Sequence, residues 1–379
     1  MATIRAEELL RHAHDNPGVT RAEAAAALGL SSGSATDIMG RLRAARLLAE
    51  ADAPPTGGRG RPTTVLTPHP DGPLVAVVEL THGTWSVTTA EIGGALAPAA
   101  VHRHDGEVRT VLPAVTAAVA GLERHHAGRV AAVGVALPGT VRGTTVMQAA
   151  TLDWRDVDLA PLGGGLPVTA GNDATLAGVA EARRGAARGY AVALHLTVEV
   201  GVGGVLLVGG EPVLGAYGAG GEFGHVPFGD PALHCPCGTT GCWDVTVDGR
   251  AMARHLGRPR PADPRTFAGD VLVAARDGDV RSRHAVEEAA SALGRGIGAL
   301  INALDPAVVT LGGLGADLLS TAEKPMAAAV LRAAMAWRRS ALPPIVPAAL
   351  GPRGPAIGAA ETAMSAVLAD LARERVTRR

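Results

Sequence analysis

The residues best suited to chemistry are the three cysteines of the chain, which cluster in one short stretch. Cys235 and Cys237 form a Cys-x-Cys pair, and Cys242 follows after a turn that contains Gly238 and Gly241. This spacing allows three thiolates to converge on one point, and thiolates are favoured ligands of Zn²⁺. The alternative is three buried cysteines that bind nothing, but thiols that serve only as buried hydrophobic groups have no reason to cluster so tightly. The stretch therefore predicts a zinc site.

A closed structural zinc site has four ligands, and a neutral imidazole commonly completes a set of thiolates. His225 lies upstream of Cys235, at a distance along the chain that lets its side chain reach the same ion. His234 is nearer, but a residue adjacent to Cys235 is badly placed to turn toward the ion that Cys235 binds. We therefore expect a structural Zn²⁺ held by four residues: His225, Cys235, Cys237 and Cys242.

The stretch from Glu222 to Asp244 resembles the signature of the ROK family, which comprises repressors, open reading frames and sugar kinases. Glu222-x-Gly-His225 is followed by Cys-x-Cys-Gly-x-x-Gly-Cys-x-acid, as in that family. The resemblance implies that the histidine and the three cysteines hold zinc, and that Glu222, His225 and Asp244 contact a sugar. The family usually has Glu where this chain has Asp244, so the carboxylate is shorter by one methylene.

A second part of the expected sugar site is the motif Gly171-Asn172-Asp173-Ala174, which precedes a predicted helix. In the ROK kinases that this motif resembles, the Asp is the general base for a sugar hydroxyl and the Asn hydrogen-bonds the sugar. Without a bound nucleotide the same carboxylate holds the hydroxyl rather than activating it. The resemblance implies sugar contacts for Asn172 and Asp173, while a plain helix cap is the other meaning of such a pair.

Two stretches resemble the phosphate-binding turns of the ROK kinases, and both depart from the family pattern. Where the kinases have Asp-x-Gly-Gly-Thr, this chain has Glu79, Thr81, His82 and Gly83, so β-carbons stand where bare backbone should approach a phosphate. The second glycine-rich hairpin carries Glu199, whose charge repels a triphosphate. These departures predict that the protein is not an enzyme of the kinase type and that Asp173 is a vestigial base.

The composition limits the classes of protein that the chain can belong to. Its 379 residues, 47% of them hydrophobic and 19% charged, suffice for two or three domains with a large core. A net charge of −1 means that any DNA binding is local, and 2% aromatic residues argue against recognition of RNA or single strands. Clustered cysteines, the lack of a long apolar segment and the lack of a secretory signal favour a cytoplasmic protein with no membrane partner.

The first part of the chain has the pattern of a helix-turn-helix. Helices are predicted over residues 4–15, 21–28 and 33–45, with a capping box at Thr20 and Glu23 that starts the second one. The third helix would read DNA, with polar side chains at its exposed start meeting bases and phosphates. These side chains belong to Ser31, Ser32, Ser34, Thr36 and Arg41. A small helical bundle used for protein contacts is the alternative.

Two short strands near residues 47–48 and 65–66 are predicted to form a wing after the third helix. The loop between them contains Arg59-Gly-Arg61-Pro, which resembles the AT-hook core whose arginines fit a narrow A·T-rich minor groove. An ordinary Pro/Gly linker with two solvated arginines is the alternative. ROK repressors resemble this arrangement of winged helix and basic linker, so we expect Arg59 and Arg61 to contact DNA.

The resemblance covers essentially the whole chain and implies an α/β fold with three parts. Residues 1–70 would form a winged helix-turn-helix domain with its basic linker. A two-lobed sugar kinase fold, actin-like and ribonuclease H-like, would follow, with a first lobe over 71–180 completed by 355–379. Its second lobe, over 181–354, would carry the structural zinc site, and the sugar would bind in the interlobe cleft. Long helices are expected over 280–304 and 356–375.

We therefore predict a sugar-responsive, DNA-binding transcriptional regulator of the ROK type, with repression as the expected sign. Its partners would be a double-stranded DNA operator, a sugar or sugar derivative, and further copies of itself in a homodimer or homotetramer. Two alternatives stay open. One is an ATP-dependent sugar kinase with a DNA-binding head, and the other is a signalling scaffold that a partner protein, rather than a sugar, releases from DNA.

Overall fold

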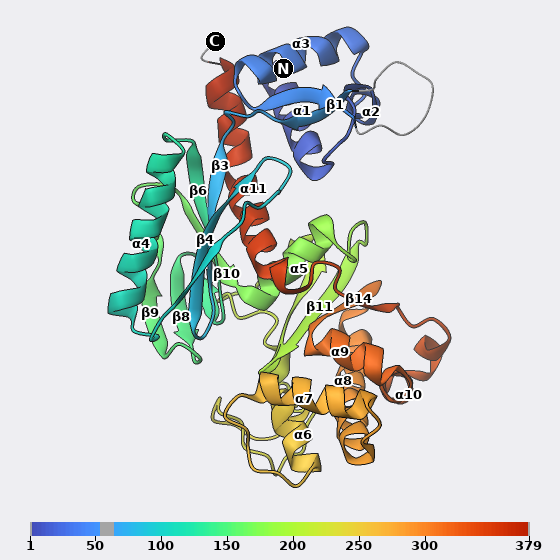
Figure 1. Cartoon of the computed structure of the whole chain (residues 1–379). Coiled ribbons are helices and arrows are strands. Elements are labelled where there is room, and N and C mark those ends of the chain that lie inside the picture. Colours follow the sequence, from blue (N-terminus) through green and yellow to red (C-terminus); the bar gives the residue numbers. More distant parts are fainter. Residues whose placement is uncertain (1, 54–63, 378–379) are drawn as a thin grey trace. The chain divides into compact units, whose positions relative to one another are not determined.

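The computed structural model describes residues 2–53 and 64–377, so Arg59 and Arg61 lie outside the described part of the chain. The chain divides into two compact units. The first unit holds Met1–Asn172 and Ala356–Arg379, and the second holds Asp173–Pro355. Figure 1 traces both units in the colours of the sequence. The last helix, α11 (Gly354–Thr377), begins in the second unit and continues in the first.

The first unit opens with three helices and a two-stranded antiparallel hairpin, which we call the head. Its elements are α1 (Ala2–Asp15), α2 (Arg21–Ala27), α3 (Ser32–Ala44), β1 (Leu48–Asp52) and β2 (Thr64–Pro68). Side-chain caps explain where two helices begin. The hydroxyl of Thr20 accepts a hydrogen bond from the N–H of Glu23 at 3.1 Å, and that of Ser31 accepts one from the N–H of Ser34 at 3.1 Å. The three helices match the predicted ranges to within two residues.

A five-stranded sheet with the order β10-β6-β3-β4-β5 forms the centre of the first unit. Its strands are β3 (Leu74–Leu80), β4 (Thr84–Glu91), β5 (Ala100–Arg103), β6 (Val130–Leu137) and β10 (Val168–Asn172). Val133 and Val135 share a core with α4 (Val108–His125), while Gly134 between them faces α11. A side chain at Gly134 would overlap the carbonyl of Ala359. The sheet therefore carries α4 on one face and α11 on the other (Figure 1).

A small antiparallel sheet follows β6 and has the order β7-β8-β9. Its strands are β7 (Thr140–Arg142), β8 (Thr145–Ala149) and β9 (Trp154–Asp158). Trp154 is buried, and its Nε1–H donates to the carbonyl of Gly106 at 2.6 Å, which ties this sheet to the segment before α4.

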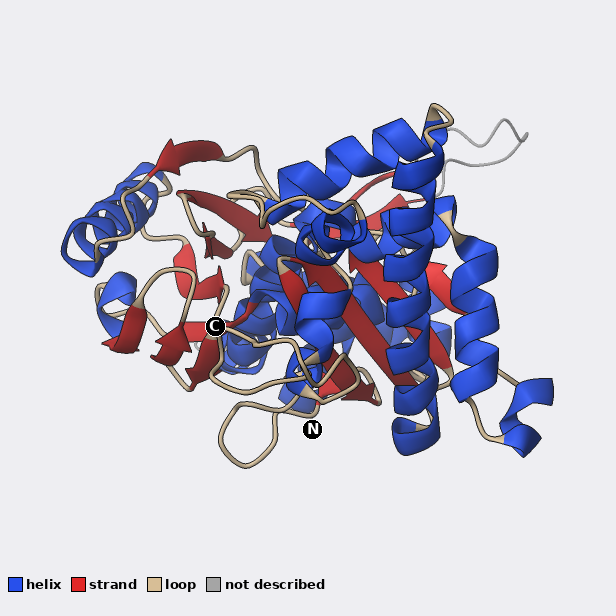
Figure 2. Ribbon diagram, turned by 90° about the horizontal axis from the view of Figure 1, so that it is seen from below, coloured by secondary structure: helices blue, strands red, loops and turns tan. Residues whose placement is uncertain are grey.

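The second unit is built on another five-stranded sheet, with the order β13-β12-β11-β14-β15. Its strands are β11 (Val192–Glu199), β12 (Gly201–Val208), β13 (Glu211–Pro212), β14 (Val308–Gly313) and β15 (Ile345–Pro347). Its helices are α5 (Asp173–Arg184), α6 (Gly249–His255), α7 (Pro264–Arg276), α8 (Val280–Leu304), α9 (Leu314–Thr321) and α10 (Glu323–Ala333). Ala193 packs in a core with α5, and the next residue, Leu194, packs in the core that holds α8, so helices cover both faces (Figure 2).

The mixed α/β architecture predicted from the sequence is confirmed. The long helix expected over 280–304 is α8, and the one expected over 356–375 is α11, which starts two residues earlier and ends two residues later. Within the described ranges, no helix combines the length and apolar character that a membrane crossing requires.

Candidate functional site

Four side chains of the second unit converge in the stretch from Glu222 to Asp244, which we call the zinc stretch. They belong to His225, Cys235, Cys237 and Cys242. One ligand atom from each lies within 4.8 Å of all the others. The two sulfurs of Cys237 and Cys242 are 3.7 Å apart, and Cys235 Sγ lies 3.8 Å from His225 Nδ1. Two sulfurs bound tetrahedrally to one zinc ion at about 2.3 Å lie about 3.8 Å apart. The spacing and the donor set of the cluster therefore fit Zn²⁺.

A tight turn brings the cysteines together. The N–H of Cys235 donates to the carbonyl of Thr239 at 2.8 Å, and the N–H of Gly238 donates back to the carbonyl of Cys235 at 3.0 Å. Gly238 has a φ of 98°, which residues with a side chain rarely adopt. His234 makes an isolated strand-like bridge in this turn and lies outside the four-residue cluster.

The three cysteines differ in their exposure to solvent. Cys235 and Cys242 are buried, whereas Cys237 is exposed. Burial, together with the neighbouring thiols, raises the pKa of the Cys242 thiol to about 12. Cysteine binds a metal as the thiolate, so a divalent cation at this cluster would have to displace the thiol protons.

Trp243, the residue after the last cysteine, fixes this stretch to α8. It is fully buried, and its Nε1–H donates to the carbonyl of Ala292 at 3.0 Å. Gly296, one helical turn further along α8, leaves room for the indole, because a Cβ at Gly296 would lie 2.2 Å from the ring. The position of the cluster thus depends on a glycine in the middle of a long helix.

We expect Gly296→Ala to destabilise the protein by about 1–3 kcal/mol, because the added methyl would overlap the indole of Trp243. Gly269→Ala in α7 is the matched control, since nothing lies within 4 Å of the Cβ it would add. That change should raise stability by up to about 1 kcal/mol through better helix propensity. Urea unfolding of both variants checks the prediction, and equal effects of the two would contradict it.

Asp244 links the zinc stretch to the start of β12. Its Oδ1 accepts a hydrogen bond from the N–H of Val202 at 2.8 Å, and its Oδ2 accepts one from Nη2 of Arg250 at 3.0 Å. Arg250 is itself buried and donates from Nε to Asp248 at 2.7 Å. A carboxylate offers about four acceptor sites, so Asp244 retains capacity for a sugar hydroxyl while it holds the protein together. Its sugar contact stays a prediction.

The imidazole of His225 faces the cysteines with one ring nitrogen and a carboxylate with the other. Its Nδ1 faces Cys235 Sγ, and its Nε2 lies 3.8 Å from Oε2 of Glu222. Metal-bound histidines commonly turn their second ring nitrogen to such a carboxylate, which fixes the ring orientation. Glu222 and His225 are both about half exposed, with side-chain exposures of 49% and 40%, so a ligand can reach them.

Asp173 is the first residue of α5, and it lies close enough to Glu222 for the two carboxylates to interact electrostatically. Burial raises the pKa of the Asp173 carboxyl, and the charge of Glu222 raises it further. Asn172 ends β10 in the first unit, where its Nδ2 donates to the carbonyl of Gly139 at 3.2 Å. Thus Asp173, Glu222, His225 and Asp244 belong to the second unit, and Asn172 adjoins Asp173 along the chain.

The first phosphate-like turn, between β3 and β4, satisfies its own backbone groups. Thr81 Oγ1 accepts hydrogen bonds from the N–H of Thr84 at 3.0 Å and from that of Gly83 at 3.4 Å. Backbone N–H groups of such turns are what hold a phosphate in proteins that bind one. A phosphate would therefore compete with a hydroxyl that is already in place.

At the second phosphate-like hairpin, Glu199 takes part in an ion network that the sequence did not reveal. Arg265 Nε lies 2.7 Å from Oε2 of Glu199, and Arg265 Nη2 lies 3.2 Å from Oδ2 of Asp317. The Glu199 carboxylate fills the space beside Gly313, where a Cβ would lie 2.2 Å from its Oε1. Since Arg265 is 66 residues from Glu199 along the chain, no local motif could have indicated the pair.

The residues predicted to read DNA lie on the surface of the head. All five are exposed: Ser31, Ser32, Ser34, Thr36 and Arg41. Ser31 is the N-cap of α3 and also donates its hydroxyl to Ser34 Oγ at 2.9 Å, so it shapes the helix start besides facing solvent. The hydroxyl of Thr36 donates to the carbonyl of Ser32 at 2.9 Å.

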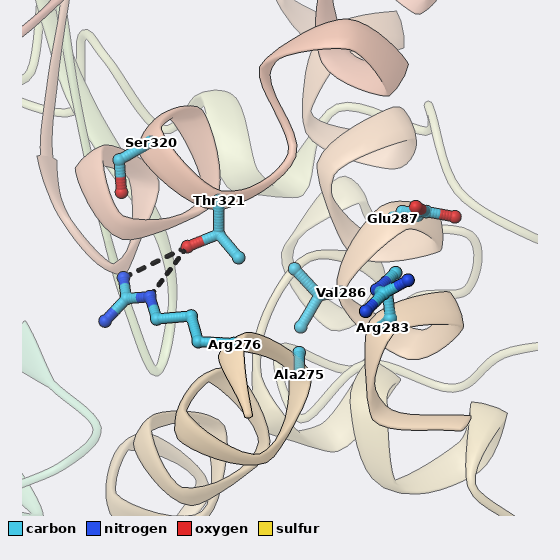
Figure 3. Close-up of a pocket in the computed structure, with 7 residues that line it drawn as sticks. All are labelled: Ala275, Arg276, Arg283, Val286, Glu287, Ser320 and Thr321. Carbon is cyan, nitrogen blue, oxygen red and sulfur yellow. Dashed lines mark hydrogen bonds between the residues drawn. The ribbon is translucent and has the colours of Figure 1, made fainter. Parts of the chain in front are cut away.

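A shallow pocket lies between α7, α8 and α9 of the second unit (Figure 3). Both Nε and Nη2 of Arg276 donate to Thr321 Oγ1, at 3.3 and 3.0 Å. The pocket shares no residue with the predicted sites, and the Thr321 hydroxyl already accepts the two hydrogen bonds from Arg276. Its lining consists of Ala275, Arg276, Arg283, Val286, Glu287, Ser320 and Thr321.

The chain forms two mixed α/β units, each centred on a five-stranded sheet, and its fold is similar to that of sugar kinases, as in the structure of a ROK family glucokinase from Streptomyces griseus (TM-score 0.66, 27% identity, 77% of this chain and 99% of that chain). The chain belongs to the ROK family: the sequence model of that family matches residues 86–366. The family predicted from the zinc stretch is thereby confirmed.

The relatives of the chain include both kinases and regulators. A glucokinase from Streptomyces coelicolor is 28% identical over 305 residues, which cover 72% of this chain and 96% of the glucokinase. A xylose repressor from Bacillus spizizenii is 23% identical over 183 residues, or 47% of each chain. The crystal structure of a ROK family transcriptional regulator, a homologue of the E. coli MLC protein, superposes with a TM-score of 0.79 at 21% identity. That superposition covers 100% of this chain and 99% of the regulator.

Proposed function

We propose that this protein is a sugar-responsive, DNA-binding transcriptional regulator of the ROK type, acting as a repressor in the cytoplasm. The observation that carries the proposal is the head. The superposed regulator covers the whole chain, head included, whereas the glucokinase matches 72% of it. Phosphoryl transfer to a sugar gives no role to three helices and a hairpin placed before the ROK domain.

The head is assigned as a winged helix-turn-helix in which α3 enters the major groove of a double-stranded operator. Ser31, Ser32, Ser34, Thr36 and Arg41 are assigned to bases and phosphates, since all are exposed at or along α3. The β1–β2 hairpin is assigned as the wing, and Arg59 and Arg61 to the minor groove. A homodimer or homotetramer would place two heads on two half-sites about one helical turn apart.

The inducer is assigned as a sugar or sugar derivative bound by Asn172, Asp173, Glu222, His225 and Asp244. Carboxylates suit this ligand because hydrogen bonds from hydroxyls to charged acceptors are stronger than those to neutral ones. His225, Cys235, Cys237 and Cys242 are assigned to a structural Zn²⁺, which fixes the loop that carries three of the sugar contacts. A sugar can change DNA affinity only as far as it prefers one conformation of the protein over another.

The second candidate is an ATP-dependent sugar kinase, which the glucokinase relative favours, as does Asp173, the residue that resembles the general base of the kinases. Two features oppose it: the Thr81 hydroxyl that accepts from the N–H groups of its own turn, and the Glu199 carboxylate at the second turn. A triphosphate would have to displace the hydroxyl and face the carboxylate.

The testing experiment is selection of random duplex DNA by the purified full-length protein, repeated with a panel of sugars that includes D-glucose and D-xylose. We expect enrichment of palindromic, A·T-containing sites whose binding one sugar weakens. Arg59→Ala/Arg61→Ala should lower affinity and reduce the slope of log affinity against log salt by about 2. Arg258→Ala/Arg260→Ala, a pair with the same spacing in the second unit, is the control and should change neither.

The outcomes separate the candidates. No enriched site, together with ATP consumption in the presence of some sugar, would establish the kinase. Enriched sites that no sugar affects would point to the scaffold that a partner protein controls.

A further inference from the structure

A buried joint connects the head to the rest of the first unit. His14, near the end of α1, is 1% exposed and Glu361 of α11 is 0% exposed. His14 Nδ1 accepts a hydrogen bond from the N–H of Gly93 at 2.9 Å, so its other nitrogen carries the proton. That nitrogen, Nε2, lies 3.1 Å from Oε2 of Glu361 and donates to it. One neutral imidazole therefore bonds two segments that are far from it along the chain.

Two segments of the first unit contact the head at this joint: the turn after β4 and helix α11. Gly93 belongs to the turn after β4, and this turn also contacts the head at Pro17, since a Cβ on Gly93 would lie 3.8 Å from the proline ring. Glu361 approaches from α11, whose backbone packs closely on β6. A buried carboxylate is costly unless it is bonded, so the pair strongly favours one position of α1 against α11.

The other end of α11 lies against the helix that begins at the predicted sugar residue. In the second unit, a Cβ on Gly354 would lie 3.1 Å from the Cβ of Ala177 of α5. Glu181, also of α5, accepts hydrogen bonds from the N–H groups of Ala349 at 3.1 Å and Leu350 at 2.8 Å, just before α11. Because α5 starts at Asp173, one helix connects the predicted sugar residue to the segment that leads into α11.

These contacts form one continuous route. It runs from Asp173 through α5 to the start of α11, along that helix for about 10 Å at 1.5 Å per residue, and through the Glu361–His14 joint to α1. A helix is a stiff element, and a buried hydrogen-bonded pair has few alternative arrangements, so this route is suited to carrying a shift from one end to the other.

We propose that His14 and Glu361 are positioning residues that couple the two sites. A shift that sugar binding causes at Asp173 would reach α1, and with it the DNA-reading helices, through α11 and this pair. This inference rests on the proposed function, because it needs both a DNA site and a sugar that weakens DNA binding. The two residues touch neither ligand. Their contribution is the coupling between the two sites, measured as the ratio of DNA affinities without and with sugar.

The test measures that ratio in the full-length protein, with the selected duplex and the active panel sugar as probes. In the wild type we expect the sugar to weaken DNA binding by about tenfold or more. Glu361→Ala should still bind duplex and sugar with affinities within about threefold of the wild type, but its ratio should fall below about twofold. Glu361→Gln should restore most of the ratio, because its amide oxygen still accepts from His14 Nε2.

Arg373→Ala is the matched control. Arg373 also joins α11 to α1, through Glu7 at 3.8 Å, but the arginine side chain is 64% exposed, so the pair should contribute little. Its ratio should equal that of the wild type. If the ratio of DNA affinities without and with sugar were the same in Glu361→Ala as in the wild type, the inference would be overturned. A wild-type protein that selects no DNA site, or whose DNA binding responds to no sugar, would instead overturn the proposed function.

Hydrogen exchange of the wild type gives a second readout that needs no variant. Sugar binding should change amide exchange in the last turn of α1 and in the turn that contains Gly93. Unchanged exchange at both places, in a protein whose DNA binding responds to the sugar, would also overturn the inference.

Discussion

Cys242→Ser is expected to remove the metal and, with it, the response to sugar. Cys242 is fully buried at the point where the zinc stretch meets Trp243, so its replacement takes away one of four ligands and leaves a hydroxyl in a space that fits a thiolate. Structural zinc sites in small peptides hold their ion with about 10–16 kcal/mol, so losing the ion should cost far more than an ordinary surface substitution. We expect zinc content to fall from about one ion per chain to about zero, together with a clear drop in the unfolding temperature.

The effect should extend to sugar binding because the cluster positions its neighbours. His225 is shared between the cluster and the predicted sugar site, and Asp244 follows Cys242 by two residues. Metal analysis, thermal unfolding and sugar calorimetry on Cys242→Ser check the prediction, with chelation of the wild type as an independent route. His234→Ala is the control, because His234 lies in the same turn but outside the cluster. Wild-type protein without bound zinc, or full sugar affinity in Cys242→Ser, would contradict the prediction.

The parts of the fold that the sequence predicted well are those governed by neighbouring residues. The capping box of Thr20 and Glu23 determines where α2 begins, and the four residues of the Cys/His cluster lie within one short segment. Local hydrogen bonds and the conformational freedom of Gly238 help to bring the cysteines together. Such features leave a readable pattern because each residue and its partner are only a few positions apart.

The parts that the sequence could not predict depend on contacts between distant residues. Nothing near His14 indicates that its imidazole bonds Glu361, which is 347 residues away, or that Arg265 reaches Glu199. The prediction for Asp244 was likewise incomplete. Its resemblance to a sugar-binding residue gave no sign that it also accepts hydrogen bonds from Val202 and Arg250. Only the tertiary structure reveals that one carboxylate has several partners.

Asp173→Asn is expected to lower sugar affinity by about 10- to 100-fold, because a hydrogen bond to a charged acceptor contributes about 1.5–3 kcal/mol. The variant should also lose a pH dependence that the wild type shows. Burial raises the pKa of Asp173, so this carboxyl takes up a proton at a higher pH than an exposed aspartate would. The ionised form accepts from a sugar hydroxyl, and wild-type affinity should therefore be full above the raised pKa and fall as the pH drops through it.

Stability should follow the opposite trend, which makes the test specific. A carboxyl whose folded-state pKa lies above its unfolded value favours the folded state in its protonated form, so the contribution of Asp173 to stability grows as the pH falls through the raised pKa. In Asp173→Asn both trends should vanish, and the variant should be more stable than the wild type at neutral pH. Glu211→Gln is the control, since Glu211 is a surface carboxylate bonded to Arg183. If Asp173→Asn gained stability but kept its sugar affinity, Asp173 would be a helix cap alone, and the sugar would depend on Glu222 and His225.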